Sequence, residues 1–355
     1  MNNQLDEIDD LLNSFDDISL LSSNRKVNED ESNQSPIYIP EDGIDPRLKL
    51  LSHSSRETLS RCPRRFQLYR LSSLSKESDE DDVEHAYAQL TLDFGKFVGE
   101  GIQELLQGTS LDTILFSMFI RWNIDIELRD DKRSKSLWDA VQAVETFAAL
   151  LNSGYLNDYE IVEYNGKSAV ELSFRIRLPD GFYYRGFIDV VLRNKLTGAI
   201  VVLEDKTTYY SEVNNAQYKN SGQALGYSIF LDHIYPGISS YSVLYLVYST
   251  SRREYIELPF EKSANQRARW LTELIEDTKM IQLYESFEVY PMRGHECYSF
   301  YKECQYLGLC TMSTEHITKK LTVADYKKLM EAEDKAYDFD IDFYDLIDTQ
   351  ISRNE

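Results

Sequence analysis

The stretch that most constrains the fold lies at residues 184–208, which read YRGFIDVVLRNKLTGAIVVLEDKTT. Two β-rich runs, at residues 186–192 and 200–203, are joined by turn-forming residues, so the sequence predicts a hairpin. Asp189 lies in the first strand, and Glu204 and Lys206 end the second. Two carboxylates and an ammonium on adjacent strands make a divalent-metal site with its own positive charge, a combination that suits phosphodiester hydrolysis.

The net charge of −22 is concentrated in three segments of the 355-residue chain. Residues 1–45 carry −10, residues 76–85 carry −5 and residues 325–355 carry −6, which leaves the rest nearly neutral. The acidity therefore does not exclude a nucleic-acid partner. No apolar run reaches the roughly 18 residues of a membrane span, and the N-terminus is acidic where a signal peptide is basic. We expect a cytoplasmic protein without a membrane partner.

The order of the elements predicts a mixed α/β core with a helical flank. We expect an acidic disordered tail at residues 1–48, one domain at 49–320 with a helical insertion at 86–155, and an acidic helix or tail at 321–355. Predicted helices span residues 54–71, 90–108, 110–126, 135–151, 213–231 and 264–284. Predicted strands span residues 160–164, 169–177, 183–192, 200–206, 242–248 and 254–259.

Both acidic ends carry apolar residues among their acids. In the first, Leu5, Ile8, Leu11, Leu12 and Phe15 recur at helical spacing, which favours folding on a partner's basic groove. A solubilising tail is the alternative.

The predicted helix at residues 54–71, with Ser55 as its expected N-cap, carries the most basic patch of the chain. Such a patch suits phosphate contacts, and a solvated helical face is the alternative. Pro63, directly after Cys62, predicts a break or a new helical start. The residues predicted to contact DNA are Arg56, Arg61, Arg64, Arg65 and, at the start of the hairpin, Arg185.

The four cysteines of the chain are unevenly spaced: Cys62 stands alone, and Cys297, Cys304 and Cys310 lie within fourteen residues. This clustering indicates a shared ligand, and a cytosolic location disfavours disulfides. Four thiolates suit a 4Fe-4S cluster or tetrahedral zinc equally by count. Close CxxC pairs, which zinc sites usually have, are missing from the sequence. Either metal would tie the N-terminal helix to the C-terminal cysteines.

Several motifs occur together in one order: S-x-x-x-L-x-x-C-P-x-x-F at residues 55–66, G-x-x-D at 186–189, E-x-K at 204–206, Q-x-x-x-Y at 223–227, and C-x6-C-x5-C at the end. Over residues 54–310 the chain thereby resembles the PD-(D/E)xK nuclease superfamily. The resemblance is to its RecB-like iron-sulfur branch, as in AddB and the CRISPR-associated Cas-four exonucleases, and is closest to phage-type members. Each motif alone is weak, but their order and separation are specific.

The resemblance implies a restriction-endonuclease-like mixed sheet flanked by helices, with the two ends joined by a 4Fe-4S cluster on the four cysteines. It also implies Mg²⁺ or Mn²⁺ bound by Asp189, Glu204 and the backbone carbonyl of Asp205. Lys206 would then orient the attacking water, and Gln223 and Tyr227 would help to place DNA.

One position departs from the family pattern. A G-x-x-x-H frame often supplies a histidine to the metal site, but here the frame ends in Gly99. Glu100 or Glu104 on the same predicted helix is a candidate substitute.

The sequence therefore predicts a metal-dependent DNA exonuclease that acts on DNA ends or single strands in phage recombination, replication or repair. A nuclease-like DNA-binding protein with weak or lost catalysis is one alternative. A regulatory protein that engages a recombination or replication partner through its acidic tails is another. The chain carries no P-loop, so any unwinding comes from a partner.

Overall fold

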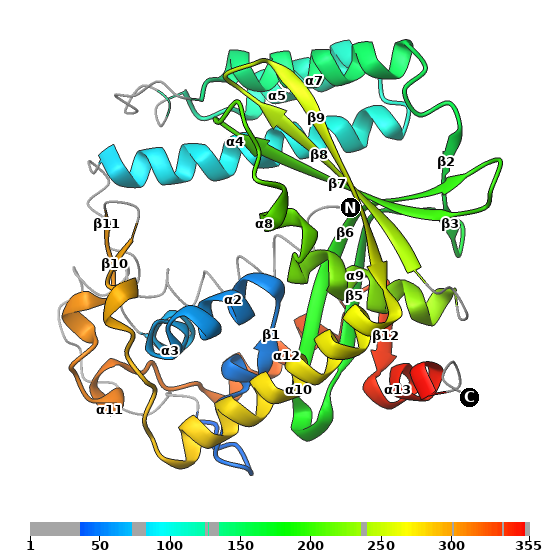
Figure 1. Cartoon of the computed structure of the whole chain (residues 1–355). Helices are drawn as coiled ribbons and strands as arrows, with labels where there is room; N and C mark the ends of the chain where they lie inside the picture. The colour runs from blue at the N-terminus through cyan, green and yellow to red at the C-terminus, as the bar shows by residue number, and fades with distance from the viewer. Residues whose placement is uncertain are drawn as a thin grey trace. The chain divides into compact units, whose positions relative to one another are not determined.

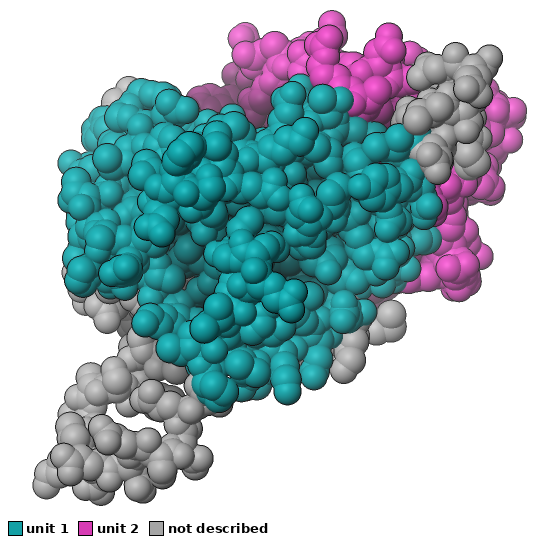
Figure 2. All heavy atoms as spheres, turned by 90° about the horizontal axis from the view of Figure 1, so that it is seen from below, with its two compact units in different colours: residues 1–77, 173–186, 271–348 teal, residues 78–172, 187–270, 349–355 magenta. Residues whose placement is uncertain are grey.

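The computed structural model describes residues 36–72, 83–124, 127, 135–235, 240–299, 302–335 and 337–351. Contacts divide the chain into two compact units, which Figure 2 shows in different colours. Unit 1 comprises residues 1–77, 173–186 and 271–348, and unit 2 comprises residues 78–172, 187–270 and 349–355. Within the described residues, no helix is long and apolar enough to cross a membrane. The predicted N-terminal helix at Leu5–Phe15 falls outside the described residues, and the predicted boundaries at 48 and 320 stay predictions.

A mixed β-sheet has the strand order β12-β5-β6-β7-β8-β9, with β1 and β2 also paired to β6 (Figure 1). Strands β6 and β7 are antiparallel, whereas β7 and β8 are parallel. A parallel pair needs a crossover, which α8 (Asn215–Lys219) and α9 (Gly222–Ile234) supply. The predicted mixed α/β fold is confirmed. The strands are β1 (Leu50–Leu51), β2 (Tyr159–Ile161), β5 (Val170–Arg177), β6 (Tyr183–Asn194), β7 (Ile200–Thr208), β8 (Ser240–Ser249), β9 (Glu254–Ser263) and β12 (Phe339–Asp342).

In unit 2, helices α4 (Val83–Leu106), α5 (Leu111–Arg121) and α7 (Leu137–Asn152) form a layer with its own apolar core against the sheet (Figure 1). Phe94, Phe147 and Leu203 are buried in this core. Burial of each such side chain stabilises the fold by about 1.5–3 kcal/mol. The core therefore holds α4 against strand β7.

The predicted helix at residues 54–71 is two helices in unit 1, α2 (His53–Arg61) and α3 (Pro63–Leu71), with Cys62 between them. Pro63 is the first residue of α3, where its missing N–H leaves no hydrogen bond unmade. The predicted break is confirmed. The predicted N-cap is wrong: Ser52 caps α2, and Ser55 is its partner in a capping box, because its hydroxyl accepts a hydrogen bond from the Ser52 amide.

Unit 1 also holds the cysteine-rich region, which consists of short elements after the long helix α10 (Ala264–Ser286). The cysteines lie on or beside η4 (Gly294–Glu296), β10 (Tyr298–Ser299), β11 (Lys302–Glu303) and η5 (Leu307–Leu309), which α11 (Thr314–Ile317) follows. The remaining short elements are η2 (Pro46–Lys49), η3 (Pro179–Gly181), β3 (Glu163–Tyr164) and β4 (Lys167–Ser168).

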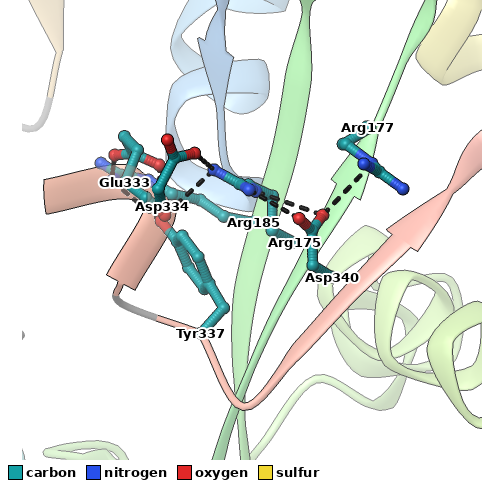
Figure 3. Close-up of polar contacts among 7 residues, drawn as sticks. All are labelled: Arg175, Arg177, Arg185, Glu333, Asp334, Tyr337 and Asp340. Carbon is teal, nitrogen blue, oxygen red and sulfur yellow. Dashed lines mark hydrogen bonds and ion pairs between the residues drawn. The ribbon is translucent and has the colours of Figure 1, made fainter. Parts of the chain in front are cut away.

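The acidic C-terminal segment forms α12 (Val323–Lys335), β12 and α13 (Phe343–Ile351), and β12 pairs in parallel with β5. Figure 3 shows the ion pairs that anchor it. Arg175 Nη2 lies 2.6 Å from Asp340 Oδ2, and Arg185 Nη1 lies 2.5 Å from Oε1 of the fully buried Glu333. The segment that the sequence predicts as an acidic helix or tail thus contributes α12 and β12 to unit 1.

Candidate active site

Strands β6 and β7 bring the predicted hairpin residues together in unit 2. Val190 pairs with Leu203, so Asp189 and Glu204 follow at the same end of the paired run. The Asp205 amide donates a hydrogen bond to Asp189 Oδ2 at 3.2 Å. Lys206 Nζ donates to Glu204 Oε1 at 2.5 Å, because residues two apart on a strand share a face. The site therefore contains the predicted carboxylates and ammonium.

Asp205 contributes its side chain as well as its backbone. A Cβ atom placed on Gly99 of α4 would lie 3.1 Å from Asp205 Oδ2 and 3.2 Å from Oδ1. The carboxylate thus lies against the α4 backbone, at a place where a larger side chain would crowd it. Sequence reasoning assigned only the backbone carbonyl of Asp205 to the site, since alternation sends its side chain to the opposite face from Glu204.

The proposed substitute ligand on α4 has another partner. Glu100 Oε2 lies 2.8 Å from Arg121 Nη1 of α5, and Lys96 approaches its other oxygen at 4.0 Å. Gln103, one turn beyond Gly99, instead reaches the sheet and donates a hydrogen bond to Glu171 Oε1 at 2.5 Å. Glu104 stays a prediction.

Glu171 of β5 is a residue that sequence reasoning missed. Removal from water, and then the nearby Asp189 carboxylate, raises the pKa of Glu171 to about 7. The side chain is still exposed, so solvent screens part of this effect. Its only sequence signal is one carboxylate within an apolar run, which is too common a pattern to identify a site.

Carboxylates outnumber the ammonium at this site. Burial, and then the Asp189 charge, holds the pKa of Glu204 well above its usual range, and the same two causes act on the pKa of Asp205. Burial also raises the pKa of Asp189, against the attraction of Lys206. Burial alone lowers the Lys206 pKa, but attraction by Glu204 and Asp189 outweighs it and leaves that pKa raised. Lys206 is therefore an ammonium at neutral pH.

Two observations on metal binding differ. In the described part of the chain, no three His, Cys, Asp or Glu side chains already surround a point as metal ligands. Yet Glu204 is 1% exposed, and its Oε2 atom is buried without a hydrogen-bond partner. The buried acceptor and the excess negative charge favour a cation here, because carboxylates that lie close together repel one another. Their oxygens suit a hard divalent cation.

The predicted pair on α9 is brought side by side. Gln223 Nε2 donates a hydrogen bond to Tyr227 Oη at 2.6 Å, which confirms that residues four apart share a face. Tyr227 is buried. Tyr245, which sequence reasoning missed, lies beside Glu204 in the parallel β7–β8 pair. Burial is the main reason why the pKa of Tyr245 is raised to about 12.

The four cysteines are free thiols in unit 1. Cys62 is buried at the junction of α2 and α3, and Cys304 and Cys310 pack against a small apolar cluster. Burial, and then the thiols of Cys304, Cys62 and Cys297, raises the pKa of Cys310. The other three thiols therefore lie within electrostatic reach of Cys310.

The predicted DNA-contacting arginines are placed differently from one another. Arg64 is buried and donates to Gln67, Thr314 and the Met312 carbonyl, and Arg185 is buried against Glu333 (Figure 3). Both guanidinium groups thus make bonds within the chain. Residues at least partly open to solvent are Arg56, paired with Asp277, Arg61, paired with Glu57, and Arg65.

The chain is also similar to known proteins. A family model of the PD-(D/E)XK nuclease superfamily matches residues 50–311. No curated protein matches the chain significantly. A solved structure from Eubacterium rectale, named "Putative exonuclease", is similar over 81% of this chain and 100% of its own, at 13% identity and a TM-score of 0.42. That likeness is too distant to bear on function.

Proposed function

The chain belongs to the PD-(D/E)XK nuclease superfamily, and from this premise we propose that it is a divalent-metal-dependent deoxyribonuclease that hydrolyses phosphodiester bonds at DNA ends. The observation that carries the proposal is the group of Asp189, Glu204, Asp205 and Lys206 on one hairpin, with a buried Glu204 oxygen that lacks a partner. We place the protein in the cytoplasm, in a phage-infected host if the chain is phage-encoded.

In this proposal, Asp189, Glu204 and the Asp205 backbone carbonyl hold Mg²⁺ or Mn²⁺. When bound, such an ion polarises the scissile phosphate and lowers the pKa of a water molecule. Lys206 donates a hydrogen bond to the reacting phosphate or water and offsets negative charge that develops on the phosphate. Because Lys206 keeps its proton at neutral pH, it acts as a donor and not as a general base.

Gln223 and Tyr227, hydrogen-bonded on one face of α9, help to position the DNA in this proposal. Arg56, Arg61 and Arg65 supply phosphate contacts from α2 and α3, whereas Arg64 and Arg185 support the fold. Glu100 leaves the proposed metal shell because Arg121 neutralises it.

We further propose that the protein is of the RecB-like, phage-type form and serves in recombination, replication or repair. In this form, the four cysteines hold a 4Fe-4S cluster. Four free thiols, three of which lie within electrostatic reach of Cys310, support this assignment. When bound, the cluster fixes Cys62, between α2 and α3, to the C-terminal cysteine region.

Cleavage of end-labelled DNA tests the function. Single- and double-stranded substrates are incubated with anaerobically purified protein in Mg²⁺, Mn²⁺ or EDTA. Lys206→Ala is expected to reduce the rate about 100-fold or more. Lys195→Ala, on the exposed turn of the same hairpin, is the matched control and is expected to keep full activity. Absence of metal-dependent cleavage under every condition overturns the proposal.

A second candidate function is a nuclease-like DNA-binding protein without catalysis, which works with a recombination or replication partner. Gly99, which stands where the family's G-x-x-x-H frame has a histidine, favours it. DNA binding without cleavage in the same assay supports this candidate.

A further inference from the structure

Strand β5 has an unusual backbone conformation at its second residue, Glu171. This residue has φ +51°, a left-handed conformation that is rare for a residue other than glycine and uncommon within a strand. Its neighbours Val170 and Leu172 are both buried, and all three residues belong to the same strand, Val170–Arg177. A left-handed residue within a strand is typical of a bulge, which re-aims a side chain. Such conformations persist where the surrounding structure imposes them, and they cluster at functional sites.

Helix α4 reaches two carboxylates from one face. Gly99 lies against the Asp205 carboxylate, and Gln103, four residues later, bonds Glu171 Oε1. One helical turn advances about 5.4 Å, so these two positions hold Glu171 and Asp205 next to each other across the helix surface. Asp189, which accepts a hydrogen bond from the Asp205 amide, is close enough to Glu171 to disfavour its charge. Three carboxylates therefore gather on this side of the site.

The same group contains an acceptor that no protein donor reaches. Glu204 is almost wholly buried, and its Oε2 atom makes no hydrogen bond. Lys206 lies near three of the carboxylates, those of Glu204, Asp189 and Asp205, and its hydrogen bond goes to the other Glu204 oxygen. A divalent cation satisfies both the charge and the buried acceptor.

We propose that Glu171 is a further metal-site residue, which Gln103 holds in place so that its carboxylate binds divalent cation together with Asp189. The inference rests on the proposed nuclease function and extends it. All donors are then carboxylate or carbonyl oxygens, which favours Mg²⁺ and Mn²⁺ over Zn²⁺. Glu171 acts from β5, a strand that carries none of the residues predicted from the sequence motifs.

Direct measurement of Mn²⁺ binding to the full chain, by calorimetry and by electron paramagnetic resonance, tests the inference without DNA. Glu171→Gln is expected to weaken Mn²⁺ binding about 10-fold to 100-fold. Asp189→Asn serves as the reference loss. Glu163→Gln, which removes an exposed carboxylate of the same unit, is the matched control and is expected to change affinity no more than about twofold.

Glu171→Gly distinguishes a loss of Mn²⁺ binding caused by the missing carboxylate from one caused by misfolding. Glycine adopts positive φ without strain, so this variant is expected to melt at or above the wild-type temperature while binding Mn²⁺ as weakly as Glu171→Gln. If Glu171→Gln binds Mn²⁺ like the wild type while Asp189→Asn does not, Glu171 is no ligand and the nuclease proposal stands. If the wild type binds no Mn²⁺, both proposals fall.

Discussion

Glu204→Gln is expected to be more stable than the wild type in EDTA and less stable than the wild type in Mg²⁺. In EDTA, the substitution removes a carboxyl group whose pKa is held well above its usual range. The fold therefore disfavours the ionised form of Glu204. A buried acceptor without a partner costs about 1–3 kcal/mol, and Glu204 Oε2 is such an atom. The weakened bond to Lys206 offsets part of that gain. The offset is only partial because Lys206 is partly exposed to water and lies close to the Asp189 carboxylate. We expect a net stabilisation of about 1 kcal/mol.

Magnesium reverses the difference in stability between the variant and the wild type. A cation that binds only the folded protein stabilises it by about 2.7 kcal/mol at a concentration 100 times its Kd. The wild type gains this free energy of unfolding, whereas Glu204→Gln gains little because it lacks one ligand charge. The variant is then the less stable protein in Mg²⁺.

Urea unfolding of both proteins, in EDTA and in Mg²⁺, measures this reversal. Glu163→Gln is the control and is expected to stay within about 0.5 kcal/mol of the wild type in both buffers. The reasoning is refuted if Glu204→Gln is the less stable protein in EDTA, or if Mg²⁺ stabilises both proteins equally.

Three further predictions concern other parts of the molecule. Arg185→Met leaves the buried Glu333 charge unpaired and is expected to cost about 3–5 kcal/mol in unfolding experiments, while Arg185→Met with Glu333→Leu restores much of this loss. In EDTA, a carboxylate with a raised pKa gives stability that is complete below about pH 4 and is lost as pH rises through its folded pKa. Burial raises the pKa of Glu171 to about 7, so urea midpoints are expected to fall from pH 4 to 8. Cys62→Ser and Cys304→Ser are each expected to lower the iron content of anaerobically purified protein, which metal analysis checks against the wild type.

Local patterns predicted the central hairpin well. Asn194 and Gly198 lie at its turn as expected, and alternation placed Glu204 and Lys206 on one face of β7. These features depend on neighbours within a few residues, so the sequence carries them. The length of the second strand was underestimated, since β7 continues to Thr208 through polar residues that pair with β8.

Helix boundaries were less predictable. The expected helix at residues 213–231 is divided into α8 and α9, with Ser221 at the N-cap position of the second. Lys262 of β9 donates to the carbonyls of Tyr218 and Lys219, at the end of α8. Because this partner lies more than forty residues away, no local pattern contains the reason for the break.

The charged residues show the same limit. Arg185 and Glu333 are 148 positions apart, so the sequence presents Arg185 as a free cation and the fold buries it. Glu171 and Gln103 are 68 positions apart and meet only because α4 packs on the sheet. Motifs identified Asp189, Glu204 and Lys206, whereas residues that depend on contacts between elements required the structure.

The central claim is that carboxylates of this hairpin support metal-dependent DNA hydrolysis. Its most direct test is the cleavage rate of end-labelled DNA by wild type and by Asp189→Asn, each in Mn²⁺ and in EDTA. We predict cleavage by the wild type in Mn²⁺ alone, and a loss of about 100-fold or more in Asp189→Asn. Equal rates for the two proteins, or cleavage that persists in EDTA, would contradict the claim.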